Sequence, residues 1–568
     1  MIGADLICDV LEELGVRHVF GLPGTQNVLL YEALRRHGMR SVSTSDEGAA
    51  AFMATGYARA SGRVGVLTTI PGPGFVYALA GIVEAHHDSV PLLWLTLRQA
   101  DNARAFQLQR IDQAAMAAPV VKRCMHVERV EELGDALHEA QREALAGEPG
   151  PVLVEIAARV LEAEVPVLRF RNVSETEAPA PFDLEALLAL LALLKESQRV
   201  VIYAGQGAQG SADEVRRLAL RLHAPVLFTS SGRGVLPDTD ALAFVQDFSL
   251  GLGNVIPELI DRADLVLALG CKFTHNGSAG ARLQLPSQKL ARIDSSATVL
   301  AANYPARLAI EARVEDVLAR LPTSDLPRGR WTARELSDLR ARLDKENSAP
   351  IPHEPLLGDV STGSVREFFR TLSYETGGNA LYAADAGLHQ VLTRRYAVAT
   401  LPRGLLCPSD FQSMGFGLPG AIGAALARPE TCVIACVGDG GLALSAGELL
   451  TAVREGIDLV VVVFNDGQLN LIRRQQVTRF GYESGVRLRN PDYRALAEAV
   501  GCSYFPIAGD MESVVSHVIA TRGVRLVELR LADNPSFHLQ QIRSVVRERV
   551  RPLVPAGVWQ ALKSFVTR

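Results

Sequence analysis

Residues 431–467 read TCVIACVGDGGLALSAGELLTAVREGIDLVVVVFNDG. The two apolar runs in this stretch, residues 431–437 and 458–464, have the length and the Val-rich composition of buried parallel strands. The segment between them suits a helix, with Ser445 as its expected N-cap and Glu448 three positions later, the spacing of a capping box. The stretch therefore predicts a strand–helix–strand unit, the building block of a parallel α/β sheet.

Polar residues and glycines follow both predicted strands at the point where each ends. Gly438-Asp439-Gly440-Gly441 follows the first strand, and Asn465-Asp466-Gly467 follows the second. Because neighbouring parallel strands end at the same edge of a sheet, Asp439 and Asn465 should lie close together. A carboxylate and an amide oxygen suit a Mg²⁺ ion that holds a diphosphate, and the glycines allow peptide N–H groups to approach phosphates. An ordinary turn with an Asp and an Asn is the alternative interpretation.

Composition excludes several classes of protein. The 568 residues are 48% hydrophobic and 21% charged, with a formal net charge of −5, which argues against a disordered or fibrous chain and against a nucleic-acid binder driven by bulk charge. No apolar run approaches the ~20 residues of a membrane span. The seven cysteines form no CxxC pair, and no signal-peptide pattern is present. We expect a reduced cytoplasmic protein with no nucleic-acid or membrane partner.

Two stretches resemble linkers: the Pro- and Glu-rich residues 163–183 and the charged, Pro-rich residues 322–360. They separate three blocks in which short apolar runs alternate with helical patterns. The expected strands are residues 15–20, 64–69, 92–96, 199–204, 225–229, 263–269, 380–383, 431–437, 458–465 and 524–529. We predict an α/β fold of three doubly wound parallel-sheet domains, at 1–165, 184–325 and 360–535, followed by a basic tail at 536–568.

The spacing of GDG and the strand-ending Asn resembles the thiamin-diphosphate motif. Over nearly all of residues 1–535, the chain resembles the acetolactate synthase-like family of thiamin-diphosphate enzymes. The resemblance implies a pyrimidine-binding, a central and a diphosphate-binding domain, in that order, with thiamin diphosphate and Mg²⁺ as cofactors. It assigns the metal to Asp439, Asn465 and the backbone carbonyl of Gly467. The cofactor-binding residues that it implies further are Gly438, Gly440 and Gly441.

The first block carries a candidate catalytic carboxylate, Glu47. Glu47-Gly48-Ala49-Ala50 resembles the family segment whose glutamate bonds to N1′ of the aminopyrimidine and so promotes loss of the thiazolium C2 proton. Such a carboxylate needs a sheltered position and a pKa suited to sharing a proton. The alternative is a surface Asp46–Glu47 pair at a helix start, which the helix dipole favours.

Two further motifs support the resemblance. Ser413-Met414-Gly415 resembles the start of the loop whose large apolar side chain separates the two cofactor rings, so Met414 is the expected wedge; a core gap-filler is the alternative. Gln109 stands where the family has a Gln that reaches the cofactor. Arg110 replaces the Glu that follows it, either to receive a substrate carboxylate or as a solvated helix residue.

Other candidates have weaker signals. Thr25 and Gln26 follow the opening Pro-Gly, where they would face the substrate or cap a turn. Leu471 begins a segment that resembles the family's Met-Val-Arg and is a substrate candidate. The pair His86-His87 does not align with the histidine pair of pyruvate decarboxylases, so we expect packing or interface roles for it.

The resemblance implies decarboxylation of a 2-oxo acid, with carboligation of the resulting enamine to a second carbonyl. Gln475 replaces a Trp of the biosynthetic acetohydroxyacid synthases, and the central block lacks their Arg-Phe-Asp-Asp run, which counts against FAD. The alternatives are a non-ligating decarboxylase resembling benzoylformate decarboxylase, a C–C lyase or hydrolase acting on an acyl-CoA or cyclic diketone, and a catalytically silent regulatory relative. The family places its cofactor between two chains, which implies a homodimer or homotetramer.

Overall fold

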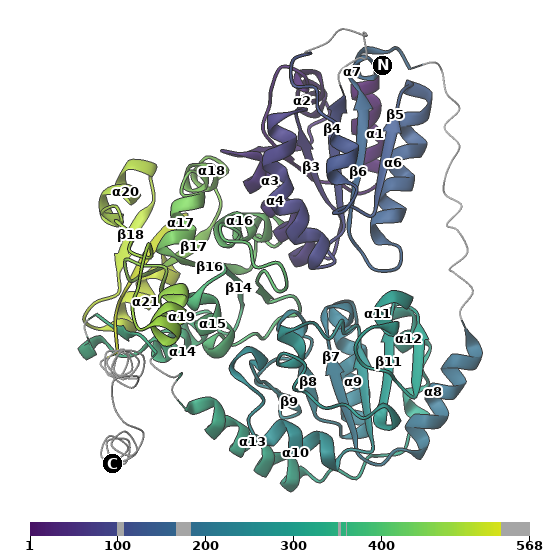
Figure 1. The fold of residues 1–568 in the computed structure, drawn as a ribbon, viewed down its shortest axis with the longest axis vertical. Helices are drawn as coiled ribbons and strands as arrows, with labels where there is room; N and C mark the ends of the chain where they lie inside the picture. Colours follow the sequence, from purple (N-terminus) through teal and green to yellow (C-terminus); the bar gives the residue numbers. More distant parts are fainter. Residues whose placement is uncertain (99–106, 166–182, 350, 352–353, 359, 535–568) are drawn as a thin grey trace, which may run out of the picture.

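The protein consists of three α/β units, each built on its own sheet (Figure 1). The structure, a computed structural model, describes residues 1–98, 107–165, 183–349, 351, 354–358 and 360–534. The predicted tail at 536–568 and most of the predicted linker at 163–183 lie outside this range. No helix within it is both long and apolar enough to cross a membrane. The predicted fold class, three doubly wound units with parallel sheets, is confirmed.

The first sheet has six parallel strands. Their order is β2 (Arg40–Ser43), β1 (His18–Gly21), β3 (Gly65–Thr69), β4 (Leu92–Arg98), β6 (Pro151–Ala157) and β5 (Arg123–Val127). The helices of this unit are α1 (Gly3–Glu13), α2 (Val28–Arg36), α3 (Glu47–Ser61), α4 (Pro73–His87), α5 (Gln113–Ala117), α6 (Val130–Leu145) and α7 (Ala158–Glu162). One core packs α1, α2 and α6 against the sheet and another packs α3 and α4, so helices cover both of its faces.

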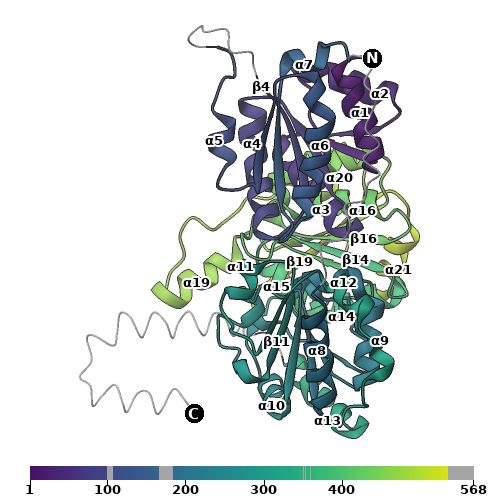
Figure 2. The same ribbon diagram turned by 90° about the vertical axis from the view of Figure 1, so that its right-hand side faces the viewer.

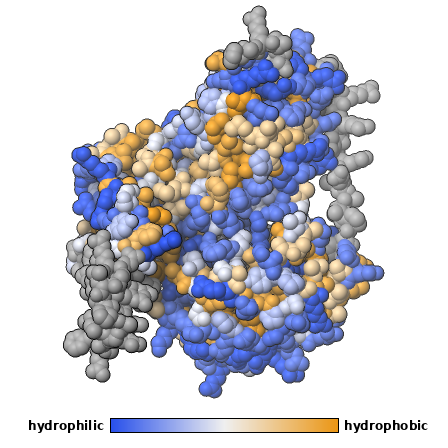
Figure 3. Space-filling view, in the orientation of Figure 1, coloured by the Kyte–Doolittle hydropathy of each residue, from blue (hydrophilic) through white to orange (hydrophobic). Residues whose placement is uncertain are grey.

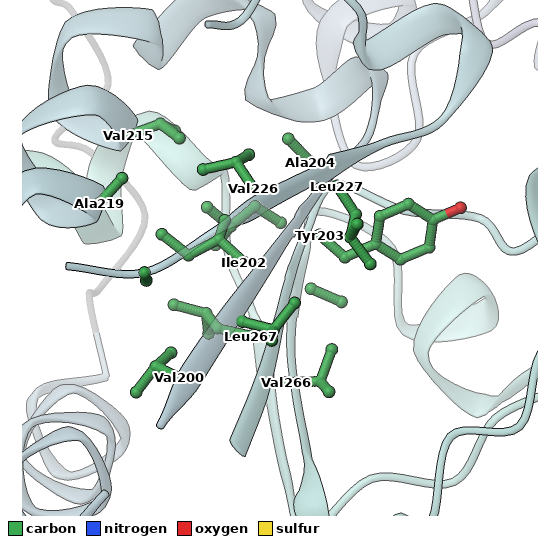
Figure 4. Packing of buried hydrophobic residues seen from close by; sticks show 14 of the residues in the cluster. Val200, Ile202, Tyr203, Ala204, Val215, Ala219, Val226, Leu227, Val266 and Leu267 are labelled. Carbon is green, nitrogen blue, oxygen red and sulfur yellow. The ribbon is translucent and has the colours of Figure 1, made fainter. Parts of the chain in front are cut away.

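The central sheet also has six parallel strands. Their order is β12 (Leu308–Glu311), β11 (Leu290–Asp294), β10 (Leu265–Leu269), β7 (Val200–Ala204), β8 (Val226–Phe228) and β9 (Ala243–Phe244). The helices are α8 (Leu184–Glu196), α9 (Ala212–Leu222), α10 (Val255–Arg262), α11 (Ala297–Ala301), α12 (Val314–Arg320) and α13 (Ala333–Ser348). Figure 4 shows side chains of β7, β8, β10 and α9 packed in its core.

Helix α13 corrects one expectation from composition. Residues 322–360 were interpreted as a linker because they are charged and Pro-rich. Leu336, Leu339 and Leu343 of α13 are nevertheless buried in the core of the central unit. These three leucines recur at helical spacing on one face, and the charged residues between them face outward, so the average composition conceals an amphipathic helix.

The third sheet contains the predicted strand–helix–strand unit. The strand order is β13 (Leu356–Leu357), β19 (Val524–Ala532), β17 (Leu459–Asn465), β16 (Cys432–Gly438), β14 (Ala380–Ala384) and β15 (Leu405–Leu406), with β18 (Ser503–Pro506) also paired to β19. Only the short β13 runs antiparallel among the strands described here. The helices are α14 (Val365–Glu375), α15 (Leu388–Tyr396), α16 (Gly417–Ala427), α17 (Asp439–Ser445), α18 (Glu448–Arg454), α19 (Asn470–Phe480), α20 (Tyr493–Val500) and α21 (Met511–Ala520).

The helix between β16 and β17 differs from the prediction at its start. Ser445 was expected to cap it, but α17 begins at Asp439, directly after the strand, and Ser445 is its last residue. The Ser445 hydroxyl donates to the Gly441 carbonyl one turn earlier. A second short helix, α18, then begins at Glu448. The glycines after Asp439 are therefore the first turn of a helix rather than a loop before it.

Helices α3 and α16 join the first and third units, and Figure 2 shows them side by side between the two sheets. Their backbones approach closely because glycine lies at the crossing. A Cβ built on Gly56 would lie 2.1 Å from the Gly420 carbonyl oxygen, and one built on Gly423 would lie 2.0 Å from the Met53 carbonyl oxygen. One hydrophobic core runs through this contact. The first and third units are thus held in a defined relation within a single chain.

Candidate functional site

Oxygen atoms from two neighbouring strands converge at the carboxyl edge of the third sheet. The Asp439 side chain, only 3% exposed, accepts hydrogen bonds from the peptide N–H groups of Gly440 (2.8 Å) and Gly467 (2.7 Å). The Asn490 amide nitrogen donates to Asp439 Oδ2 and to Asn465 Oδ1, both at 2.8 Å. Asp439 and Asn465 are therefore brought together, and their oxygens face one shared point.

The Asn465 amide is held in one orientation. Its Nδ2 donates to the Glu528 carboxylate on β19 at 2.7 Å, which leaves Oδ1 directed towards Asp439. Because the two ends of an amide are distinguished by their hydrogen-bond partners, this contact identifies Oδ1 as the atom that faces Asp439. Arg530 and Tyr504 bond the same Glu528 carboxylate, and these contacts lower its pKa against the effect of burial.

A cavity of about 330 Å³ lies beside these oxygens. Strand β15 follows β14 in the chain and lies on one side of it in the sheet, whereas the next strand, β16, lies on its other side. The cavity opens at this reversal of strand order, the switch point at which open α/β sheets place ligands. Its walls include Gly438, Asp439, Gly440, Gly441, Met414 and Leu471. The Met414 side chain is 40% exposed, and its Cε would lie 3.5 Å from a Cβ on Gly440. Four of the predicted cofactor-binding residues, Gly438, Asp439, Gly440 and Gly441, thus share one cavity with Met414, whereas Asn465 and Gly467 are not among its lining residues.

A second cluster forms at the carboxyl edge of the first sheet. Gln26 Nε2 donates to Gln109 Oε1, although 83 residues separate them. The Gln109 side chain packs on the turn after β3, where a Cβ on Gly72 would lie 2.9 Å from its own Cβ. Two residues further on, a Cβ on Gly74 would lie 2.5 Å from Glu47 Oε1. The structure therefore brings Gln26, Gln109 and Glu47 together along one turn.

Glu47 has the sheltered position that its proposed chemistry requires. It is the first residue of α3, where Asp46 caps the helix by accepting the Ala49 N–H at 2.9 Å. Its side chain is 4% exposed. Burial raises the pKa of Glu47, and the nearby charge of Asp46 raises it further. Glu47 is not among the residues that line the cavity of the third unit.

The remaining candidates lie on the surface. Thr25 and Arg110 are exposed, and the Arg110 guanidinium donates to Gln107 at 3.5 Å. The ring of His87 stacks on that of Phe411, with 5.3 Å between the ring centroids. The ring of His86 lies edge-on to that of His87, with 5.8 Å between the centroids. His87 thus packs against the third unit through Phe411.

Comparisons with known proteins address the family of the chain. Family models described as the N-terminal TPP binding, central, and C-terminal TPP binding domains of thiamine pyrophosphate enzymes match residues 1–116, 187–321 and 385–529. The chain belongs to the thiamine pyrophosphate enzyme family. It is therefore an enzyme that uses thiamin diphosphate, as the resemblance in the sequence implied.

Curated relatives match this thiamine pyrophosphate enzyme over most of its length. Acetolactate synthase isozyme 1 large subunit of Escherichia coli is 29% identical, covering 98% of this chain and 96% of the relative. The acetolactate synthase large subunit of Lactococcus lactis is 28% identical, covering 98% and 95%. A probable 2-ketoarginine decarboxylase of Pseudomonas aeruginosa is 32% identical, covering 92% and 93%.

The third unit of this thiamine pyrophosphate enzyme fits a cation that holds a diphosphate. Asp439 and Asn465 supply one carboxylate and one amide oxygen, both hard ligands. In the structure the two oxygens already share a positively polarised donor, the Asn490 amide group. A Cβ on Gly440 would lie 2.9 Å from Leu469 and would fill the space beside the shared point. Gly467 has a φ of +69°, a conformation that favours glycine, as its chain turns past Asp439.

Sequence reasoning missed His389, which lines this cavity, and Asp385, whose buried carboxylate lies behind Gly441 and bonds the Gly415 N–H. Both follow β14, the strand next to β16, so the available signal was polar residues directly after a third buried strand. His389 lines the cavity, and its Nε2 is buried without a hydrogen-bond partner among the described residues. Burial lowers the pKa of His389 to about 4, which keeps the imidazole neutral. Because the other ring nitrogen bonds the Asp385 backbone, the neutral imidazole leaves Nε2 as an acceptor that suits a donor group of a ligand.

Proposed function

We propose that this enzyme uses thiamin diphosphate and Mg²⁺ to decarboxylate a 2-oxo acid and to join the remaining fragment to a second carbonyl compound. The observation that carries the proposal is the convergence of Asp439 and Asn465 beside a cavity walled by Met414. Thiamin diphosphate supplies a nucleophilic carbon and an electron sink for the carbanion left by decarboxylation. The acetolactate synthase names of two relatives favour the carboligation step.

The proposed functional residues lie at the carboxyl edges of the first and third sheets. Asp439, Asn465 and the Gly467 carbonyl hold the metal, and Gly438, Gly440 and Gly441 line the space for the diphosphate. Glu47, whose pKa burial raises, would bond the pyrimidine ring of the cofactor. Met414, in the wall of the cavity, would contact the cofactor there.

The substrate side is formed by the smaller cluster of the first unit. Gln26 and Gln109 are already bonded to each other and present amide groups that can bind a carbonyl or a carboxylate oxygen. Thr25 and Arg110 lie at the rim of this cluster, and Leu471 adds an apolar wall from the third unit. We divide the chain into a pyrimidine-binding domain at 1–165, a central domain at 184–325 on which α13 also packs, and a diphosphate-binding domain at 360–535.

We infer that the active enzyme is at least a homodimer. Within one chain the first and third units pack through α3 and α16, yet Glu47 is not among the residues that line the cavity of Asp439, so we propose that the first domain of a second copy lies over this cavity. Large apolar side chains are exposed on both units: Val76 and Tyr77 on α4, and Leu444 and Leu450 on α17 and α18. Figure 3 shows apolar surface on these two units. Burying such side chains is what drives stable association.

A decarboxylase without carboligation is the second candidate. The relative at 32% identity is named a probable 2-ketoarginine decarboxylase. The two candidates share the metal, Glu47 and Met414, and differ only in whether a proton or a second carbonyl reaches the reacting carbon.

One experiment tests the proposal and separates the candidates. Purified protein is incubated with thiamin diphosphate, Mg²⁺ and a panel of 2-oxo acids; CO₂ release is measured and each organic product is identified. A hydroxy-ketone or acetohydroxy-acid product supports carboligation, whereas an aldehyde alone supports the second candidate. Exchange of the C2 proton of the bound cofactor should be lost in Glu47→Gln. Unchanged exchange in that variant would remove Glu47 from the mechanism. A colourless purified protein would agree with the absence of FAD expected from the sequence.

A further inference from the structure

The Met414 loop is held by two buried carboxylates that come from different units. The peptide N–H of Ser413, directly before Met414, donates to Glu84 Oε2 at 2.9 Å. The peptide N–H of Gly415, directly after it, donates to both oxygens of Asp385, at 2.9 and 3.0 Å. Glu84 lies on α4 of the first unit, and Asp385 follows β14 of the third. Met414 is thus flanked on each side by a backbone group bonded to a carboxylate.

Both carboxylates are fully buried, at 0% exposure. Removing a charge from water is costly unless it is compensated, so such groups are retained where their contacts matter. The bonds of Asp385 are with peptide N–H groups, including that of Ala386 at 2.7 Å. Burial raises the pKa of Asp385 to about 7, and that of Glu84, next to the charge of Asp88, also to about 7. The N–H groups of the Met414 loop are therefore a substantial part of what stabilises these carboxylates.

The backbone has a positive φ on both sides of Met414, and at Gln412 this conformation is strained. Gln412 has a φ of +65° and Gly415 a φ of +90°. A left-handed conformation is unfavourable for a residue other than glycine, so it persists only where the surroundings fix it. The Gln412 side chain contributes to this by donating to the carbonyls of Pro408 (2.6 Å) and Ser409 (2.8 Å). Contacts from distant parts of the chain therefore fix the backbone conformation of the loop.

The Met414 side chain itself has little to hold it. It is long and flexible, 40% exposed, and projects into the wall of the cofactor cavity. Its position therefore depends on its backbone, and the backbone depends on Glu84 and Asp385.

We propose that Glu84 and Asp385 are positioning residues that form a two-carboxylate clamp on the Met414 loop and set where Met414 enters the cofactor cavity. The clamp rests on the proposed function for its catalytic meaning, because Met414 matters there through its contact with the cofactor. Because Glu84 comes from the first unit, the clamp also makes the position of Met414 depend on the contact between the first and third units.

The test combines two readouts in the full-length protein. The chain has seven methionines, so protein labelled with ¹³C at the Met methyl groups gives few signals, and comparison with Met414→Leu assigns that of Met414. Asp385→Asn and Glu84→Gln should shift and broaden the Met414 methyl signal. The signal of Met125, buried in β5, should stay in place. An unchanged Met414 signal in both variants would overturn the clamp, whatever reaction the enzyme catalyses.

The second readout is the exchange of the C2 proton of bound thiamin diphosphate. In the clamp variants we expect exchange to slow about tenfold or more, since small misplacements of positioning groups have effects of this size. Cofactor affinity should change by less than about threefold, because the metal ligands are untouched. Adding Met414→Ala to Asp385→Asn should cost little more than either change alone. If affinity and exchange fell equally, the carboxylates would be merely structural and the clamp would be wrong.

A matched control and a milder variant complete the design. Asp238 is also buried and accepts a peptide N–H from the third unit, that of Ala399 at 2.7 Å, but it bonds to Arg233 and not to the Met414 loop. Asp238→Asn should lower thermal stability and leave the Met414 signal and the exchange rate unchanged. If Asp385→Asn fails to fold, Gln412→Gly removes one anchor of the loop at a φ that glycine accepts, and it should move the same methyl signal. Absence of exchange in the unmodified enzyme would refute the proposed function, while the methyl signals would still decide the clamp.

Discussion

Replacing Asp439 by Asn tests the metal site with the smallest change in shape. The native carboxylate accepts three hydrogen bonds, from the N–H groups of Gly440 and Gly467 and from the Asn490 amide. An Asn side chain has one oxygen, so its own NH₂ group must face at least one of these donors. A buried donor left without an acceptor costs about 1–3 kcal/mol. We expect the variant to lose about that much stability before any metal is added.

The larger effect should be on Mg²⁺. Asp439 is the one full negative charge among the three proposed ligands, and Mg²⁺ relies on carboxylates to offset the loss of its water. Mutation of an outer-shell partner typically weakens metal binding by about 10–100-fold, so loss of a charged direct ligand should reach at least the upper end, about 100-fold. The assay measures the binding of thiamin diphosphate by calorimetry at increasing Mg²⁺ concentrations and fixed ionic strength.

A neighbouring acid provides the comparison. Asp466 lines the same cavity, is half-buried and accepts a hydrogen bond from the Asn470 amide at 2.5 Å, but none of the three proposed ligand oxygens belongs to it. Asp466→Asn should shift the Mg²⁺ midpoint by no more than about threefold, the effect of a nearby charge. A midpoint that moves equally in Asp439→Asn and Asp466→Asn, or in neither, would refute the assignment of Asp439 as a direct ligand.

Three further predictions follow from the packing, the charges and the surface. Gly423→Ala would place a Cβ 2.0 Å from the Met53 carbonyl and should destabilise the protein by about 1–3 kcal/mol, measured as a lower urea midpoint; an unchanged midpoint would contradict the close contact of α3 and α16. The pKa of His389 is lowered to about 4, so between pH 6.5 and 4 the unfolded chain binds more protons than the folded protein, and stability falls as the pH is lowered through this window. In His389→Asn the loss of unfolding free energy over this window should be smaller by up to about 3 kcal/mol. Equal pH profiles of stability for the two proteins would argue against a buried neutral imidazole. Tyr77→Arg, at a side chain that is 62% exposed, should shift the mass seen by light scattering towards the monomer and lower the activity with it; an unchanged dimer would exclude this part of α4 from the interface.

The sequence predicted the local parts of the site because their signals are local. Asp439 and Asn465 each end an apolar run, and adjacent parallel strands bring such ends together without help from the rest of the chain. Glu47 was found through its motif, and its burial agrees with the requirement for shelter. The expectation for Ser445 was wrong because the capping-box spacing recurs by chance, and the helix begins at the strand end instead.

The tertiary structure alone decided which distant residues complete the site. Asn490 reaches both Asp439 and Asn465, and Glu84 reaches Ser413 across 329 residues of chain. No periodicity or spacing marks such pairs, because they depend on how whole sheets and helices pack.

The sequence by itself therefore determined the fold class, the family and the strand-end residues. These signals are local, because each apolar run and the polar residue that ends it are adjacent in the chain. The close contact of α3 with α16 and the carboxylates that hold the Met414 loop were decided only by the assembled chain. The physical reason is that a buried charge is tolerated only where donors from other elements meet it, and those donors come together only when the units pack.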